Sequence, residues 1–434
     1  MTGVANSQSA APGMKRWEQA KKEAASRPIP IVLGLDRVRT VLDPMRVRQA
    51  PVVITVAGTN GKGSTCAMLD CILRAAGYRV GLYTSPHLIT FNERIRIDGR
   101  CVDDATLESA FDEVLKVPGA RELTEFELDT LAAFHALAMA SLDVWVLEIG
   151  LGGRLDAVNV LDADCGVITS IGVDHVEFLG PTREHIGFEK AHIYRAGRPA
   201  VCSDPNPPES VIRVAAGIGA QLRVQGRDFH ASLQQSRWDY QGEAWRFQGL
   251  PLPAIGGAKQ IQNAAGVLAV LESLRDRCSV SENAIRTGLT SARLSGRFQK
   301  IGDSPELYVD VAHNPEAAAV LAQSIGGLEK RGRVHAVFGI LRDKDFRGVL
   351  DAMGPAVDVW HVASTQGPRG LEASVPIGHL TSGMNQQPVH GYPGVSAAYR
   401  AAIQAAEPGD RVVAFGSFSV VSEVLQVAGI TSSF

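Results

Sequence analysis

The 434-residue sequence predicts an α/β protein with two domains, each built around a mostly parallel sheet. Runs of β-branched residues alternate with segments of helical spacing, which is the pattern of β-α-β units. The chain is also longer than one ordinary hydrophobic core organises. A change of pattern near residues 291–299 marks the expected boundary. The expected parts are therefore a tail with a short helix over residues 1–30 and two domains over residues 31–295 and 296–434.

The elements of the first domain follow from local patterns. A loose tail precedes a short helix at residues 14–24, and an extended piece leads into another helix over residues 28–43. Residues 52–58, VVITVAG, predict a buried strand, and residues 64–77 predict a helix that ends at Gly77. The next strand is expected at residues 78–85, a long helix at 123–142, and further strands at 143–153 and 164–175. Strands that alternate with helices form a mostly parallel sheet, so we expect ligands to bind beyond the carboxyl ends of these strands.

The pattern changes in the middle of the chain. Residues 225–253 contain short alternating pieces with aromatic residues, which favour a β-hairpin excursion, and residues 258–274 return to helical spacing. A second α/β series then has four strand-like runs, at residues 306–315, 333–345, 356–365 and 409–429. We expect these runs to form a second, smaller parallel domain.

The composition excludes several classes of function. The formal net charge is -3, so no overall field favours nucleic acid or an anionic membrane as a partner. The six cysteines lack C-x-x-C spacing, which favours a reducing compartment over a disulfide framework or a structural zinc site. No apolar run suffices for a membrane span or a signal core. We therefore expect a cytoplasmic monomer, with Met1 and Met14 as alternative start residues.

A glycine-rich loop follows the first buried strand, and its residues are Gly58, Thr59, Asn60, Gly61, Lys62, Gly63, Ser64 and Thr65. It is shorter than a strict P-loop and has an extra glycine after the lysine. Glycines let backbone N–H groups close on phosphate oxygens, and the helix N-terminus adds its dipole. A strand before the loop and a helix after it disfavour the alternative of a turn without a ligand. The sequence therefore predicts a nucleoside triphosphate site.

Three further motifs place ligand-type side chains near strand ends. Ser85 is a hard oxygen donor suited to Mg²⁺, and Glu148 ends an apolar strand. Asp174 and His175 follow another strand, and Lys190 lies in the FEKAHI segment after it. Ser85 could instead end a strand in a turn, and His175 could be a structural imidazole. Glu148 could be merely solvated, but its place in a phosphate-loop domain favours a role in binding the magnesium of a nucleotide.

A series of motifs occurs in order along the chain: GTNGKGST, TSPHL, TEFE, EIGLGGRLDA, GVDHVEFLG, FEKAHI, SGRF, DVAHNP and GSF. Together they resemble folylpolyglutamate synthase and dihydrofolate synthase, members of the muramyl-ligase-like ATP-dependent amide ligases. The resemblance runs from about residue 31 to the C-terminus, and its specificity lies in the number and order of the motifs. It implies a P-loop mononucleotide-binding domain with a mostly parallel sheet, followed by a smaller Rossmann-like α/β domain.

The resemblance also implies a reaction. A dihydropteroate or folate carboxylate attacks the γ-phosphate of ATP, and the amine of L-glutamate then displaces phosphate from the acyl phosphate. Such chemistry depends on positioning and charge stabilisation. The implied cofactors are two Mg²⁺ ions and a monovalent cation. Both the first glutamylation and the extension to polyglutamates are expected, because TEFE and GRLD fit the bacterial type in which the two activities occur together.

Roles of single residues follow from their places in the matching motifs. ATP binding is implied for Thr59, Asn60, Gly61, Lys62, Gly63, Ser64, Asn263, Arg297 and Asp310. Metal binding is implied for Ser85, Glu148, His175 and Lys190, the last as a lysine that relatives carry N-carboxylated. Catalytic contacts are implied for Lys62, His175, Lys190, His313 and Ser417. The pterin acid is expected along Leu33, Gly34, Leu35, Thr124, Glu125, Phe126, Glu127, Arg154, Leu155 and Asp156.

Several of these roles have simpler alternatives. Lys190 could bind phosphate unmodified, Arg297 could be a solvated hinge residue, and His313 and Ser417 could be strand-end loop residues. TEFE also fits a capping box, which is compatible with pterin contact. Among rival functions, a muramyl ligase would need an N-terminal sugar-nucleotide domain, for which the early phosphate loop leaves no room. A P-loop switch would lack the DVAHNP domain and would hydrolyse nucleotide without an acid substrate.

Overall fold

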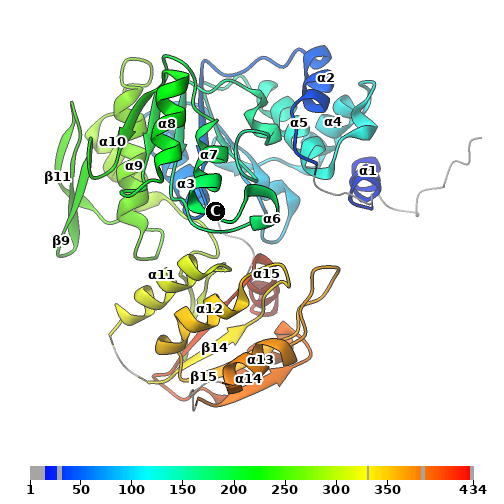
Figure 1. Cartoon of the computed structure of the whole chain (residues 1–434), viewed down its shortest axis with the longest axis vertical. Coiled ribbons are helices and arrows are strands. Elements are labelled where there is room, and N and C mark those ends of the chain that lie inside the picture. Colours follow the sequence, from blue (N-terminus) through cyan, green and yellow to red (C-terminus); the bar gives the residue numbers. More distant parts are fainter. Residues whose placement is uncertain (1–14, 27–31, 330–331, 383–386, 431–434) are drawn as a thin grey trace, which may run out of the picture.

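The computed structural model describes residues 15–26, 32–329, 332–382 and 387–430, and Figure 1 shows two α/β units, one above the other. The loose tail with Met14 and the start of the expected extended piece, residues 28–31, lie outside the described residues. The upper unit contains strands β1 to β11, and the lower unit contains β12 to β17. This architecture confirms the predicted fold class.

The larger unit is built on an eight-stranded sheet with the order β4-β3-β2-β5-β1-β6-β7-β8. Its strands are β1 Val52–Ala57, β2 Val80–Tyr83, β3 Ile95–Ile97, β4 Arg100–Cys101, β5 Val144–Glu148, β6 Cys165–Ile168, β7 Pro199–Cys202 and β8 Gln221–Val224. All are parallel except β3 and β4, which extend one edge in antiparallel pairing. Because β1 lies between β5 and β6, the loop after it opens at the middle of the carboxyl edge.

Helices cover both faces of this sheet, because successive residues of each strand point to opposite sides. Val53 of β1 belongs to the core with α1 Arg16–Ala25, α2 Asp36–Met45, α4 Asp104–Leu115, α5 Glu125–Ala138, α7 Arg183–Ala191 and α8 Glu209–Ile218. Ile54 belongs to the core on the opposite face, with α3 Lys62–Ala75, α9 Gln260–Ser273 and α10 Glu282–Ser291. Short elements are η1 Phe91–Arg94, η2 Ala120–Glu122, η3 Ala157–Val160 and α6 Val176–Leu179.

Two sequence interpretations of this unit are wrong. Helix α3 begins at Lys62 rather than Ser64, because Gly61 takes a φ of +88° as the residue before the first turn. The excursion at residues 225–253 is a three-stranded antiparallel sheet rather than a hairpin. Its strands are β9 His230–Gln234, β10 Arg237–Gln241 and β11 Arg246–Pro251. The buried rings of Trp238 and Tyr240 fix this sheet against the core that contains α9.

The second unit has a six-stranded sheet with the order β12-β13-β17-β14-β15-β16. Its strands are β12 Gln299–Asp303, β13 Glu306–Val309, β14 Val334–Phe338, β15 Val359–Ala363, β16 Val389–Tyr392 and β17 Arg411–Phe415. The prediction of four strands is wrong, since β12 and β16 form the two edges. Its helices are α11 Pro315–Gly326, α12 Phe346–Met353, η4 Gly354–Ala356, α13 Ser374–Ser382, α14 Val395–Ala405 and α15 Phe418–Val427.

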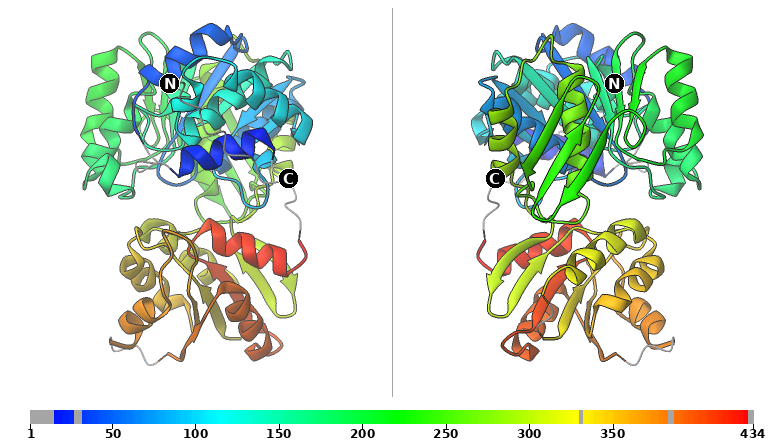
Figure 2. Two further views of the ribbon diagram at one scale, coloured as in Figure 1. Left: turned by 90° about the vertical axis from the view of Figure 1, so that its right-hand side faces the viewer. Right: turned by 90° about the vertical axis from the view of Figure 1, so that its left-hand side faces the viewer.

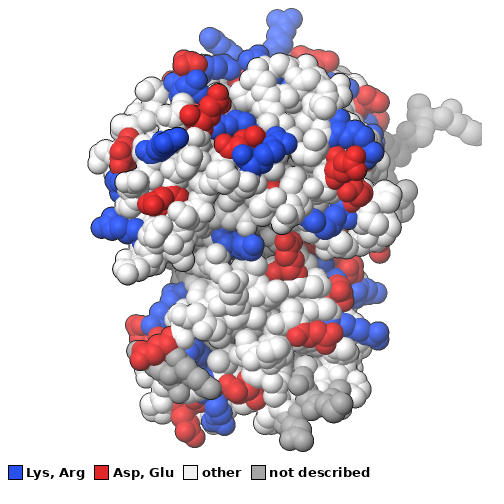
Figure 3. Space-filling model, turned by 60° about the vertical axis from the view of Figure 1, so that its left-hand side comes forward, with Lys and Arg blue, Asp and Glu red and all other residues white. Residues whose placement is uncertain are grey.

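The two units touch at the ends of their sheets. Helices α11 and α15 lie on the side of the second unit that faces the first (Figures 1 and 2). Leu88 of the first unit packs into the same apolar cluster as Val421 of α15. Charged side chains of both signs are interspersed on the face in Figure 3, as the small net charge predicts. Within the described ranges, no helix has the length and apolarity to cross a bilayer.

Candidate active site

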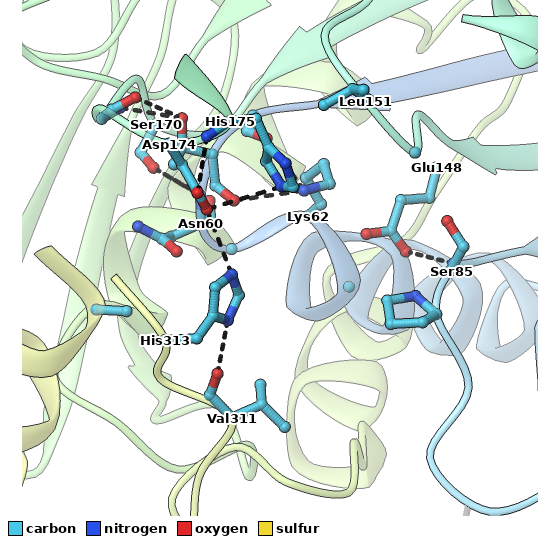
Figure 4. Close-up of a pocket in the computed structure, with 18 of the residues that line it drawn as sticks. Asn60, Lys62, Ser85, Glu148, Leu151, Ser170, Asp174, His175, Val311 and His313 are labelled. Carbon is cyan, nitrogen blue, oxygen red and sulfur yellow. Dashed lines mark hydrogen bonds and ion pairs between the residues drawn. The ribbon is translucent and has the colours of Figure 1, made fainter. Parts of the chain in front are cut away.

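A cavity of about 1210 Å³ lies between the two units at the carboxyl edge of the larger sheet. Residues from both units form its walls, and Figure 4 shows part of it, with Asn60 and Lys62 of the phosphate loop labelled. The predicted nucleotide, metal and catalytic residues all line it: Thr59, Asn60, Gly61, Lys62, Gly63, Ser64, Ser85, Glu148, His175, Lys190, Asn263, Arg297, Asp310, His313 and Ser417. The fold therefore gathers side chains that are widely separated in the sequence.

The phosphate loop is packed tightly against the strand-end loop that follows β6. Gly58 has a φ of +152°, and a Cβ atom there would lie 1.8 Å from Thr169 Oγ1. The backbone N–H of Thr59 donates to the carbonyl of Ser170 at 2.8 Å. Lys62 folds back over the loop, since its Nζ donates to the carbonyls of Gly58 at 3.1 Å and Thr59 at 3.3 Å. The loop is thus a fixed cradle with an ammonium group beside it, which suits a phosphate.

Lys190 approaches the same loop from α7. Its side chain is buried, and Nζ donates to the Gly58 carbonyl at 3.1 Å. Burial, together with the charge of Lys62, lowers the pKa of Lys190 to about 7. A large share of this lysine is therefore a neutral amine near neutral pH. The neutral amine is the form that reacts with carbon dioxide, so the environment of Lys190 fits a carbamate.

Glu148 and Ser85 lie side by side at the ends of β5 and β2 (Figure 4). Glu148 is 5% exposed, and its Oε2 accepts one hydrogen bond, from the Ser85 N–H at 3.3 Å. Burial raises the pKa of Glu148, which the charges of Lys62 and Arg297 oppose. The described part of the chain contains no group of three His, Cys, Asp or Glu able to enclose a metal. The carboxylate of Glu148 and the hydroxyl of Ser85 are hard oxygen donors, which fit Mg²⁺, an ion that takes few protein oxygens and keeps phosphate and water ligands.

Asp174 is the centre of a charged network that joins the two units. Its Oδ1 lies 2.7 Å from Lys344 Nζ, and its Oδ2 lies 3.3 Å from His313 Nε2. Burial alone would raise the pKa of Asp174, but the His313 hydrogen bond and the charge of Lys344 hold it well below its usual range. Figure 4 shows His313 pointing at Asp174, with its other ring nitrogen toward the Val311 carbonyl. The strand-end carboxylate of one unit thus contacts Lys344 and His313 of the other.

His175 follows Asp174 in the left-handed conformation, with a φ of +53°. Burial and the neighbouring charge of Lys344 lower its pKa to about 4. The imidazole is therefore neutral at physiological pH, as metal coordination requires. Lys344 Nζ lies 3.4 Å from His175 Nε2, a contact for which the neutral ring supplies the acceptor.

Arg297 and Asp310 lie in the cavity wall where the chain passes between the units. The Arg297 guanidinium faces the ring of Phe418 at 5.4 Å, and burial lowers its pKa. Asp310 accepts the N–H of Phe298 at 2.7 Å and that of Ala312 at 2.8 Å. Burial raises the pKa of Asp310, and the charge of Arg297 opposes this rise. Backbone donors thus fix the carboxylate in place beside a partly buried cation.

The residues expected to bind the pterin acid divide into two groups. Those lining the cavity are Leu33, Thr124, Phe126, Glu127, Leu155 and Asp156. Gly34, Leu35, Glu125 and Arg154 are not among the lining residues. Arg154 is held by Glu189, with Nη2 2.9 Å from Oε1, and Glu125 Oε1 lies 3.3 Å from Lys21 Nζ. These two charged side chains are therefore paired with neighbouring residues and do not line the cavity.

The apolar wall rests on a helix start. Thr124 caps α5 in a capping box, in which its N–H donates to Glu127 Oε2 at 2.7 Å and its Oγ1 accepts the Glu127 N–H at 3.3 Å. The Phe126 ring lies against Gly150, where a Cβ atom would be 2.4 Å from Cζ. Burial raises the pKa of Asp156 to about 6. The TEFE segment therefore serves as a helix cap and as cavity wall at once.

The sequence interpretation missed two residues of the network. Lys344 lies in the loop after β14 with a 7% exposed side chain, and Asn314 precedes Pro315 at the start of α11. Both occur in stretches noted for their strand pattern, RVHAVFGILRDKD and ELYVDVAHNP. Lys344 and Asn314 could have been found from their positions just after strand-like runs, because the loops at the carboxyl ends of parallel strands carry functional residues.

Comparison with known proteins agrees with this geometry. Residues 56–271 match the Mur ligase middle domain, and residues 296–418 match the Mur ligase, glutamate ligase domain. The dihydrofolate synthase/folylpolyglutamate synthase of Escherichia coli (strain K12) is 44% identical over 398 residues, 92% of each chain. The structure of E. coli FolC in complex with DHPP and ADP has a TM-score of 0.90 and 41% identity, and the match covers 95% of this chain and 97% of that one.

A second solved structure shows the same likeness. It is the bifunctional folylpolyglutamate synthase/dihydrofolate synthase from Yersinia pestis complexed with AMPPNP and Mn ion. Its TM-score is 0.88 at 42% identity, and the match covers 94% of this chain and 97% of that one. The conserved architecture, the two matched domains and the identity over nearly the whole length agree. The chain therefore belongs to the dihydrofolate synthase/folylpolyglutamate synthase family of Mur-type, ATP-dependent amide ligases.

Proposed function

We propose that this chain adds L-glutamate to dihydropteroate to form dihydrofolate, and adds further glutamates to folates, with release of ADP and phosphate. One observation carries the proposal. A single cavity joins a phosphate loop, a buried carboxylate and an apolar wall from the first unit to cationic residues of the second. Such a cavity can hold a triphosphate, an acid with an aromatic body and an amino acid together.

The residues support a two-step transfer through an acyl phosphate. Lys62 and the backbone N–H groups of the loop orient the triphosphate so that the acid carboxylate attacks the γ-phosphorus as ADP leaves. The glutamate amine then attacks the acyl carbon, and phosphate leaves. The two units enclose the reaction, which protects the acyl phosphate from water. His313 and Ser417 line the second-unit side of the cavity, where we place the incoming glutamate.

Magnesium completes the proposed site. Ser85, Glu148 and His175 would bind magnesium, and a carboxylated Lys190 would supply oxygen ligands beside a second ion. When bound, these ions neutralise phosphate charge and orient the phosphate oxygens. The neutral imidazole of His175 and the depressed pKa of Lys190 support these roles. The proposal also includes a monovalent cation, a monomeric state, a cytoplasmic location and a domain boundary at residues 295 and 296, between α10 and β12.

The test is release of ADP by the purified full-length chain with ATP, Mg²⁺, L-glutamate and dihydropteroate. We expect one ADP per amide formed, no turnover without the acid, and loss of turnover on chelation of the metal. Folate-type acids and muramyl substrates, assayed side by side, separate this function from its nearest rival. ADP release without any acid would indicate a nucleotide switch, and turnover with muramyl substrates alone would refute the assignment.

A further inference from the structure

The side chain of Asn60 in the phosphate loop is held by the second unit. Its Nδ2 donates to Asn314 Oδ1 at 3.3 Å and to Glu316 Oε2 at 3.0 Å. In return, Asn314 Nδ2 donates to Asn60 Oδ1 at 3.1 Å. Both polar atoms of the Asn60 amide are therefore used in contacts with residues more than 250 positions later in the chain. In this arrangement the Asn60 side chain joins the units, and phosphate binding falls to Lys62 and the backbone N–H groups at the start of α3.

Asn314 links three parts of the structure through one amide group. Its side chain is 3% exposed and caps α11, with Oδ1 accepting the Ala317 N–H at 2.9 Å. Its Nδ2 also donates to Asp174 Oδ2 at 3.3 Å. The amide thus contacts the loop after β1, the loop after β6 and the first turn of α11. We call these contacts of Asn314 with Asn60 and Asp174 the Asn314 clasp.

The clasp favours one relative position of the two units. An amide that is buried and hydrogen-bonded with the units together would lose these partners if the units moved apart. The partners on the first unit are the phosphate loop and the loop that carries His175. A movement of the second unit therefore acts directly on the two segments that border the proposed nucleotide site.

We propose that Asn314 is a positioning residue that couples closure of the second unit to the geometry of the phosphate loop. It acts through Asn60 and Asp174 and does not contact the reacting atoms. The inference goes beyond the proposed ligase function and rests on it only for the assay of turnover. It predicts that loss of the clasp slows the chemical step far more than it weakens nucleotide binding, because Lys62 and the loop backbone remain intact.

Two substitutions separate the clasp from the helix cap. Serine and aspartate are N-caps about as good as asparagine, so Asn314→Ser and Asn314→Asp both keep α11 capped. Asn314→Ser lacks the amide N–H groups. Asn314→Asp keeps the shape but places a carboxylate against Asp174 and the Asn60 oxygen. The control is Ser281→Asn, which exchanges one cap residue for another at α10, outside the cavity.

The experiment combines kinetics with small-angle scattering of the full chain, with and without AMPPNP. Asn314→Ser should lower kcat about tenfold with the KM for ATP nearly unchanged, and Asn314→Asp should lower it further. Both should keep a larger radius of gyration than wild type with AMPPNP, while Tm stays near that of wild type. The double variant Asn60→Ser/Asn314→Ser should be no slower than its slower single variant.

Wild-type kcat and compaction in both Asn314 variants would overturn the proposal. A fall in Tm that accounts for the lost activity, without a change in compaction, would also overturn it, because Asn314 would then be only a cap. If the wild type does not ligate glutamate but contracts with AMPPNP while the variants do not, the coupling stands and the proposed function fails.

Discussion

A buried histidine pair in the second unit makes the stability of the fold depend on pH. His335 Nδ1 lies 3.2 Å from His361 Nε2 on the adjacent strand. His335 Nε2 lies 3.2 Å from Asp410 Oδ2, and His361 Nδ1 lies 3.1 Å from Tyr392 Oη. His335 is 1% and His361 2% exposed. Burial, followed by the charges of His335 and His390, lowers the pKa of His361 from 6.5 to about 4.

The sign and size of the effect follow from this pKa. The unfolded chain binds a proton at His361 more tightly than the folded chain does. The contribution of His361 to the free energy of unfolding is therefore complete above pH 6.5, and it falls as the pH decreases toward 4. At pH 5 the linkage relation gives a loss of about 2 kcal/mol relative to pH 8. Such a loss is a substantial part of the free energy of unfolding of an ordinary domain.

The assay is urea unfolding at pH 8 and pH 5, followed at β15 by hydrogen-exchange mass spectrometry. The test variant, His361→Gln, cannot titrate, and the control His230→Gln changes an exposed histidine on β9 of the first unit. Wild type and His230→Gln should lose about 2 kcal/mol more between the two pH values than His361→Gln does. An equal loss in all three proteins would refute the reasoning, whatever the stability of His361→Gln at pH 8.

Three further substitutions test the packing and the site. Lys21→Met should lower the free energy of unfolding by about 2–3 kcal/mol, because the buried Asp129 carboxylate loses an ammonium group 2.9 Å away. The control Lys22→Met changes an exposed lysine on the same helix, and it should change the free energy of unfolding by less than about 0.5 kcal/mol in the same urea titration. Gly58→Ala should weaken AMPPNP binding at least about tenfold by calorimetry, since its Cβ would meet Thr169 Oγ1, and unchanged affinity would contradict the packing of the loop. Glu148→Gln should lower kcat about 100-fold. It should also raise Tm, because it removes a charge that burial disfavours, and a fall in Tm would contradict this expectation.

Apolar periodicity made the central strands predictable and left the edges unpredictable. The run VVITVA is buried along its whole length, so its sequence alone indicates a strand between two layers. The edge strands β12 and β16 read QKIGD and VHGY, with no continuous apolar run or clean alternation. Their strand conformation depends on pairing with a neighbour, which a local pattern does not contain. The same reason explains why the antiparallel sheet of β9 to β11 looked like a hairpin.

The candidate site was predictable where motif and topology coincide. Lys62 and Glu148 follow or end neighbouring parallel strands, so the sheet brings them to one edge as the sequence order predicts. The contacts of Asp174 with Asn314 and Lys344 were not predictable, because the partners lie 140 and 170 residues away in another unit. Their meeting depends on how the two units pack together, which no local spacing encodes.

The charges inside the cavity distinguish a binding site from a structural ion-pair network. Burial lowers the pKa values of Lys190 and Arg297 and raises that of Glu148, so in each case the environment disfavours the charged form. Pairing between these groups would stabilise their charges, yet the described residues contain no ion pair that joins them. Asp174 differs, because Lys344 Nζ lies 2.7 Å from its carboxylate and its pKa is held well below the usual range. A cavity with unpaired buried groups of both signs is suited to a ligand that is itself of both signs, as a triphosphate with its divalent cation is.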